Sequence, residues 1–301
     1  THEQQYEDIK YALFKHYRLN GIPRSQKEVK VYQKIIGKDL YSREDKALSF
    51  NAKHDHYFVH GVYSHALGDL MKSYAYQKKL VDFLQKYPER SHQQPVKYIT
   101  ALSNYSNICY SIKKYDECLS LIKKMREVPA KSIQMQIRIF ITSYERELEL
   151  YKNTGEYHKG ILLIKDVEKG IRLYKGSIPN SYILAFYFNI ASLYFGIRDY
   201  SNSLVWLNKI FNDVSLKNSR TDLYCFTQIV NLIVHFELGN VDLLEYVVRS
   251  TYRYLYKWDR LYKVENSIMI FIRKKIPVII ADKERIEAFK ELKIELEKIT
   301  K

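Results

Sequence analysis

The chain of 301 residues is poor in glycine, proline and cysteine, with 10, 6 and 3 copies. No stretch is rich in Gly, Ser or Pro, which excludes a long flexible linker between domains. An odd and low cysteine count excludes a framework of disulfide bonds. We expect Cys109, Cys118 and Cys225 to be reduced thiols among apolar helix residues, and we therefore predict a cytoplasmic protein.

Sequence motifs of catalysis are also missing. The chain has no glycine-rich phosphate loop, no nucleophile elbow and no pair of carboxylates in a recognisable context. Nothing in the sequence positions Cys109 against His158. We therefore predict that the protein is not an enzyme and uses no cofactor.

Histidines gather between His54 and His65, and they are the best candidates for metal ligands. His56 and His60 are four residues apart, so they share one helix face and could supply two zinc ligands. However, no glutamate follows His56 in a metalloprotease pattern, and no cysteine lies near. We therefore expect partly buried, hydrogen-bonded histidines and no metal site.

Acidic residues are outnumbered by basic ones, 34 against 49, which gives a net charge of +15. Such an excess favours attraction to acidic proteins, nucleic acids or anionic membranes. A composition biased toward Lys, Ile, Tyr and Asn explains the same excess without any partner. The charge alone therefore does not identify a function.

Residues 176–197 carry no charge, and this stretch approaches the length of a membrane span. However, Pro179-Asn180-Ser181 is typical of a helix start, and Asn189 and Ser192 lie inside the stretch. We expect a buried helix here and no membrane span.

A short turn followed by a helix start recurs five times along the chain. Aligning the five turns gives steps of 45, 42, 43 and 41 residues. A period of this size predicts stacked pairs of helices, each pair too small to bury its apolar face alone. The turns are Gly68-Asp69-Leu70, Lys114-Tyr115-Asp116, Gly155-Glu156-Tyr157, Asp199-Tyr200-Ser201 and Gly239-Asn240-Val241.

Helix boundaries follow from capping residues and breakers. We expect one long helix to start at Ser42 and run to Leu67, and another to run from Tyr157 to Leu173. Two helices, Leu261 to Lys275 and Lys283 to Lys298, finish the chain. Cys109 and Cys118 should face each other across a short turn, because antiparallel helices meet there.

The turns and the residues before them resemble the tetratricopeptide repeat over about residues 57–257. The resemblance rests on Lys114-Tyr115-Asp116-Glu117-Cys118, on the segment Tyr151 to Tyr157, and on Asn189 to Tyr194 with Asp199-Tyr200. The pitch exceeds the 34 residues of that family, and Leu148, Leu232 and Leu244 replace small residues at helix crossings. In pitch and tyrosine content, the repeats look like those of uncharacterised bacterial proteins of the Bacteroidota.

The resemblance implies an all-α, right-handed α-solenoid of stacked antiparallel helix pairs, with about 14 helices. We predict a single domain over residues 1–301. It comprises divergent N-terminal helices over 1–53, five repeats over 54–257 and capping helices over 258–301.

In the tetratricopeptide family the first helices of the repeats line a groove that binds peptides. An asparagine amide both donates and accepts, so it can hold a peptide unit. The alternative for each asparagine is a hydrogen bond between helices. Among cations only Arg146 falls on this groove, so a C-terminal carboxylate ligand is not expected. Carried over residue by residue, the groove holds Ser103, Asn104, Asn107, Tyr110, Arg146, Phe188, Asn189 and Ser192.

The corresponding face of the fifth repeat is apolar and comprises Phe226, Ile229, Ile233 and Phe236. An apolar face of this kind needs a cover. We expect another protein element to lie on it, and the C-terminal helix is a candidate.

Cations and aromatic rings alternate near the C-terminus, a pattern that suits phosphates and stacked bases. The alternative is an amphipathic helix with a solvated basic stripe. The basic surface comprises Arg249, Arg253, Lys257, Arg260 and Lys263. We therefore predict a non-catalytic scaffold that binds a protein or peptide in its groove, and we rank a regulatory module that binds nucleic acid second.

Overall fold

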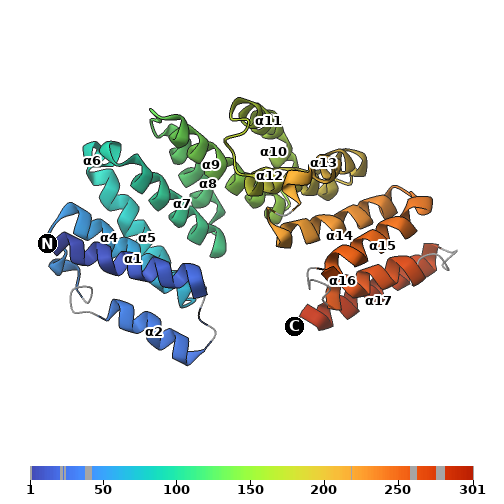
Figure 1. The fold of residues 1–301 in the computed structure, drawn as a ribbon, viewed down its shortest axis with the longest axis horizontal. Helices are drawn as coiled ribbons and strands as arrows, with labels where there is room; N and C mark the ends of the chain where they lie inside the picture. Colours follow the sequence, from blue (N-terminus) through green and yellow to red (C-terminus); the bar gives the residue numbers. More distant parts are fainter. Residues whose placement is uncertain are drawn as a thin grey trace. The chain divides into compact units, whose positions relative to one another are not determined.

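The computed structural model describes residues 2–20, 23, 25–37, 43–217, 219–257, 263–275 and 282–300. Every regular element in these ranges is helical, which confirms the all-α class. The helices form two compact units, Thr1–Arg146 and Glu147–Lys301, called unit 1 and unit 2 below (Figure 1). In the described ranges, no helix combines the length and the apolar character that crossing a membrane requires.

Unit 1 is built from helices that pack in sequence order. α2 packs on α1, α1 packs on α4, and two antiparallel pairs follow, α4 with α5 and α7 with α8 (Figure 1). The short α6 links α5 to α7. The helices are α1 (His2–Asn20), α2 (Gln26–Ile36), α4 (Phe50–Ala66), α5 (Leu70–Lys86), α6 (Pro88–Gln93), α7 (Pro95–Ser111) and α8 (Tyr115–Glu127).

Unit 2 also contains helices that pack in pairs. α9 (Ile133–Thr154) ends in this unit, α12 pairs with α13, α14 pairs with α15, and α16 packs on α17. The remaining elements of unit 2 are α10 (Tyr157–Leu162), α11 (Ile164–Leu173), α12 (Asn180–Gly196), α13 (Tyr200–Asn212), the 3₁₀ turn η2 (Val214–Leu216), α14 (Thr221–Glu237), α15 (Val241–Lys257), α16 (Lys263–Ile270), the π-helical turn η3 (Phe271–Lys275) and α17 (Asp282–Thr300).

All five predicted turns are observed, and each holds one residue with a positive φ. These residues are Gly68 (78°), Lys113 (63°), Gly155 (79°), Arg198 (62°) and Gly239 (69°). The N–H of the next residue bonds back to the helix in four turns, from Asp69 to Ser64, Lys114 to Cys109, Asp199 to Tyr194 and Asn240 to His235. A left-handed residue with this bond is the Schellman helix end, which satisfies the last carbonyls of the first helix.

The predicted helix from Ser42 to Leu67 is wrong at its start. Ser42 lies outside the described residues, and residues Glu44–Lys46 form only a 3₁₀ turn, η1. The chain leaves the helical conformation at Ala47 (ψ 81°). Ser49 then caps α4, because its hydroxyl accepts a hydrogen bond from the N–H of Ala52 at 3.2 Å.

Two further predicted helices are interrupted. The helix expected from Tyr157 to Leu173 divides at Leu163, whose N–H bonds to the carbonyl of Gly160 in a tighter turn. The helix expected to end at Lys275 passes into the π-helical turn η3 at Phe271. Its predicted start, Leu261, lies outside the described residues.

Each unit has an apolar core of its own. In unit 1, Tyr6, Leu13 and Tyr32 are fully buried between α1, α2 and α4. In unit 2, Leu232 and Leu255 are fully buried where α14 and α15 meet. Cys109, Cys118 and Cys225 are all buried and free, which confirms their expected packing as small apolar side chains.

Candidate ligand pocket in unit 1

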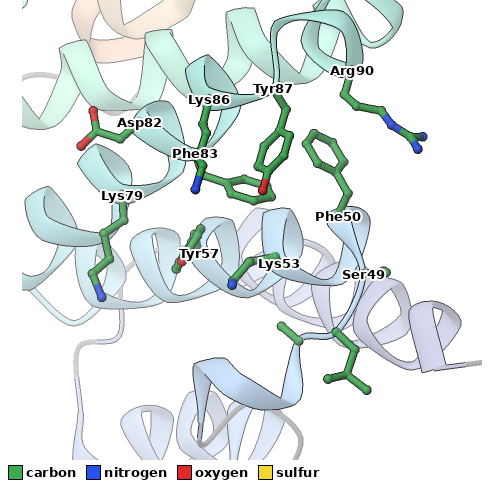
Figure 2. A pocket seen from close by; sticks show the side chains of 12 residues that line it. Ser49, Phe50, Lys53, Tyr57, Lys79, Asp82, Phe83, Lys86, Tyr87 and Arg90 are labelled. Atoms are coloured by element: carbon green, nitrogen blue, oxygen red, sulfur yellow. The ribbon is translucent and has the colours of Figure 1, made fainter.

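A pocket of about 690 Å³ opens in unit 1 beside α4 and α5. The turn between η1 and α4 forms one edge, and the junction of α5 with α6 forms another (Figure 2). A pocket of this size suits a peptide side chain with its neighbours or a small molecule.

The floor of the pocket is a cluster of four aromatic rings. The Phe83 ring centroid lies 5.0 Å from that of Phe50, 5.3 Å from that of Tyr87 and 5.9 Å from that of Tyr57. Figure 2 shows the rings of Phe50, Phe83 and Tyr87 turned toward one another. Tyr57 is buried, Phe50 and Phe83 are half-buried, and Tyr87 is exposed.

Helical spacing explains why these side chains converge. Phe50 and Tyr57 are seven residues apart on α4, and Lys79 and Phe83 are four apart on α5, so each pair lies on one face of its helix. α5 ends at Lys86 because Pro88 follows, and α6 then begins at this proline.

Four cations surround the rings. Lys79, Lys86 and Arg90 are exposed and Lys53 is half-buried. Lys79 and Arg90 stand at opposite ends of the ring cluster (Figure 2). Among the described residues that line the pocket, Asp82 is the one acid, and its carboxylate points away from the rings (Figure 2).

A hydrogen bond from Tyr57 to Glu44 holds the η1 turn against the pocket. Lys79 pairs with the other carboxylate oxygen of Glu44, at 3.2 Å. The Tyr57 hydrogen bond lowers the pKa of Glu44, and Lys79 lowers it further. Burial, followed by the bond to Glu44, raises the pKa of Tyr57. Glu44 is therefore ionised near neutral pH and neutralises part of the charge of Lys79.

The described residues that line the pocket include no histidine or cysteine. The Ser49 hydroxyl accepts the cap hydrogen bond of α4 from the N–H of Ala52. Exposed cations around an aromatic floor favour a ligand that is anionic and carries an aromatic or apolar group.

The predicted groove residues fall in both units. In unit 1, Ser103, Asn104, Tyr110 and Arg146 are half-buried and Asn107 is exposed. The Arg146 guanidinium lies 5.8 Å from the centroid of the Tyr110 ring. Phe188, Asn189 and Ser192 belong to α12 in unit 2.

Asn189 makes a bond between helices. It is buried, and its Oδ1 accepts a hydrogen bond from Lys152 Nζ at 2.9 Å. The Ser192 hydroxyl donates to the Phe188 carbonyl of its own helix. For Asn189 the structure therefore shows a hydrogen bond between helices, which the sequence analysis gave as the alternative to a ligand contact.

The basic surface is partly described. Arg249, Arg253, Lys257 and Lys263 are exposed, whereas Arg260 lies outside the described residues. The apolar face of the fifth repeat is partly covered by the C-terminal helix, as expected. The Phe289 ring of α17 lies 5.9 Å from the Phe236 ring of α14, while Phe226 is 57 % exposed.

The histidine cluster makes a buried polar network. His54 Nδ1 lies 2.8 Å from Asp55 Oδ1, and Lys10 bonds both oxygens of Asp55 at 3.0 and 2.8 Å. His56 is buried with its ring 4.5 Å from that of His60. The part of the chain that the structure describes holds no group of three or more His, Cys, Asp or Glu that could bind a metal.

Sequence reasoning missed the ligand pocket. One signal was present, since aromatic residues and cations recur at spacings of three and four on both α4 and α5.

No model of a known protein family matches the chain, and no curated protein is significantly similar to it.

Proposed function

We propose that the protein is a non-catalytic scaffold that binds a protein or peptide partner. Its helix pairs stack into a right-handed solenoid of the tetratricopeptide type, in which each pair buries the apolar face of the next. Five turns at a nearly constant spacing, each with one residue of positive φ, support this arrangement.

The observation that carries the function is the aromatic pocket of unit 1. Its four rings offer an apolar floor, while Lys53, Lys79, Lys86 and Arg90 supply positive charge around it. A partner segment that combines acidic residues with an aromatic or large apolar side chain matches both features. The side chain would occupy the floor, and the carboxylates would pair with the cations.

The groove inherited from the family resemblance is a second part of this proposal. Asn104 and Asn107 lie on α7. Asn104 is half-buried and Asn107 is exposed, so an extended peptide could reach their amides. We leave Asn189 out of the proposed ligand set, because it is buried and its Oδ1 accepts a hydrogen bond from Lys152.

Selection from a random peptide library displayed on phage, with the full chain immobilised, tests the proposal. We expect the selected peptides to be rich in Asp and Glu together with Phe, Tyr, Trp or Leu. The charge reversals Lys86→Glu and Arg90→Glu, made together, should weaken a selected peptide by at least about tenfold.

The matched control reverses Lys123 and Lys124, two exposed cations of unit 1 on α8. This double variant has the same net charge and should retain the affinity within about threefold. The proposal fails if no peptide is selected, or if both double variants bind the selected peptides equally.

A further inference from the structure

A second cationic groove lies in unit 2, where α15 packs against the π-helical turn η3. It has a volume of about 500 Å³, and Arg249, Arg253, Arg273 and Lys274 line it. None of the described residues that line it is acidic. Three of the four cations are arginines, whose planar guanidinium can bond two oxygens of one phosphate.

Exposed tyrosine side chains stand beside these cations. Tyr246 and Tyr252 line the groove and are 67 % and 45 % exposed. The rings of Tyr252 and Tyr256 are nearly parallel, at 12° with centroids 6.1 Å apart. Exposed rings in this orientation offer platforms on which bases of any sequence can stack.

The cationic surface continues into an adjoining pocket of about 430 Å³. The two pockets share Tyr246 and Arg253, and the second pocket adds Lys217 and Lys257. Both of these lysines are exposed. Together the two pockets offer six cations on and beside α15, which is more than a single anionic group requires.

We propose that this surface of unit 2 binds single-stranded nucleic acid, with phosphates on the arginines and lysines and bases on the tyrosine rings. The described lining of this surface contains no acid, which distinguishes it from the unit 1 pocket, whose lining includes Asp82. The surface binds the charged backbone and stacks the bases, so it selects single strands with little preference for sequence.

The probe is a fluorescently labelled oligouridylate of about a dozen nucleotides, a length within the usual range of such sites. Fluorescence anisotropy with the full chain at increasing salt should show binding whose affinity falls steeply with salt concentration. Reversing Arg253 and Arg273 to Glu should weaken binding by at least about tenfold and flatten the salt slope by about 1.4 units, since each phosphate contact to a single strand contributes about 0.7.

A matched control reverses Lys165 and Lys175, two exposed cations of unit 2 that line neither pocket. It changes the net charge equally and should retain affinity within about threefold. Changing Tyr246 and Tyr252 together to Ala should weaken binding by about tenfold while leaving the salt slope unchanged, because stacking releases no counterions.

Three results would overturn the proposal. The first is that the oligouridylate does not bind at low salt, or that its affinity does not fall as the salt concentration rises. The second is equal loss in the Arg253/Arg273 and Lys165/Lys175 variants, which would reduce the effect to overall charge. The third is competition by an acidic peptide as effective as that by unlabelled oligouridylate, which would assign the surface to a protein. Circular dichroism checks the fold of each variant, and Arg253→Gln with Arg273→Gln replaces the reversals if these unfold the chain.

Discussion

The ammonium of Lys152 on α9 donates a hydrogen bond to Oδ1 of Asn189 on α12, with an Nζ to Oδ1 distance of 2.9 Å. The same ammonium lies 5.5 Å from the centroid of the Phe188 ring. Two consecutive residues of α12 therefore contact one cation of α9. This contact assigns a structural role to a residue whose position in the family resemblance suggests a ligand contact.

The first prediction separates the asparagines by role. Asn189→Ala removes the acceptor from a partly buried ammonium and should lower the free energy of unfolding by about 1–2 kcal/mol. Asn107→Ala, at an exposed position, should stay within about 0.5 kcal/mol of the parent. Urea denaturation followed by circular dichroism measures both values. Equal changes in the free energy of unfolding in the two variants would contradict the structural role of Asn189. Asn189→Asp keeps an acceptor oxygen and should therefore retain most of the stability that Asn189→Ala loses.

Five turns allow a prediction about backbone conformation. Lys113 and Arg198 adopt the left-handed conformation that glycine adopts in the other three turns, and their side chains are exposed. Lys113→Gly and Arg198→Gly should each raise the free energy of unfolding by about 0.5–1 kcal/mol, since a side chain in this conformation costs about 1 kcal/mol.

The controls are Gly68→Ala and Gly239→Ala. A Cβ at either position meets no atom within 4 Å, so these changes alter backbone strain without a clash. They should lower stability by about 1 kcal/mol. Thermal unfolding monitored by circular dichroism measures all four variants, and a loss of stability in Lys113→Gly would contradict the argument.

The turns and the cover of the fifth repeat were predictable because local chemistry determines them. Gly or a polar residue occupies the left-handed position after each first helix. The apolar face at Phe236 required a neighbour, which Phe289 provides. The break before α4 was not predictable, because the residues from Ser42 onward also favour a helix cap. Ser49 forms the observed cap, and the chain leaves the helix at Ala47.

Contacts between distant positions escape sequence reasoning for a different reason. Lys152 and Asn189 are 37 residues apart, and only the packing of α9 and α12 brings them together. The aromatic floor likewise needs Phe50 from α4, Phe83 from α5 and Tyr87 from the junction with α6. Helical periodicity gives the face of each helix but not which faces meet.

The third prediction concerns the thiols. Burial, together with the nearby Glu117 carboxylate and Cys118, raises the pKa of Cys109 to about 12. Because the thiolate is the reactive species, Cys109 and Cys118 should resist a thiol reagent such as 5,5′-dithiobis(2-nitrobenzoate) at mildly alkaline pH. All three cysteines should react once denaturant unfolds the chain, and rapid labelling of either residue in the native protein would show that the packing of α7 on α8 is wrong.

The last prediction concerns pH. Burial, together with the neighbouring His60, Lys79 and Lys53, lowers the pKa of His56 from 6.5 to about 4, against the opposing effect of Glu44. Below pH 6.5 the unfolded chain therefore binds a proton that the folded chain does not. The stabilisation is complete above pH 6.5 and is lost as the pH falls through the interval to about 4, by up to about 3 kcal/mol.

The interval from pH 6.5 to 5 isolates the histidines, because carboxylates in the unfolded chain take up protons mainly below pH 5. The free energy of unfolding should decrease across this interval, and His56→Gln should make its dependence on pH shallower even though the variant is less stable throughout. Part of the slope should remain, because burial also lowers the pKa of His54. The control His92→Gln alters an exposed histidine and should leave this dependence on pH unchanged. Urea denaturation at closely spaced pH values measures the free energy of unfolding of the unmodified protein and of both variants. If the free energy of unfolding of the unmodified protein did not change over this pH interval, His56 would bind protons as readily in the folded chain as in the unfolded one.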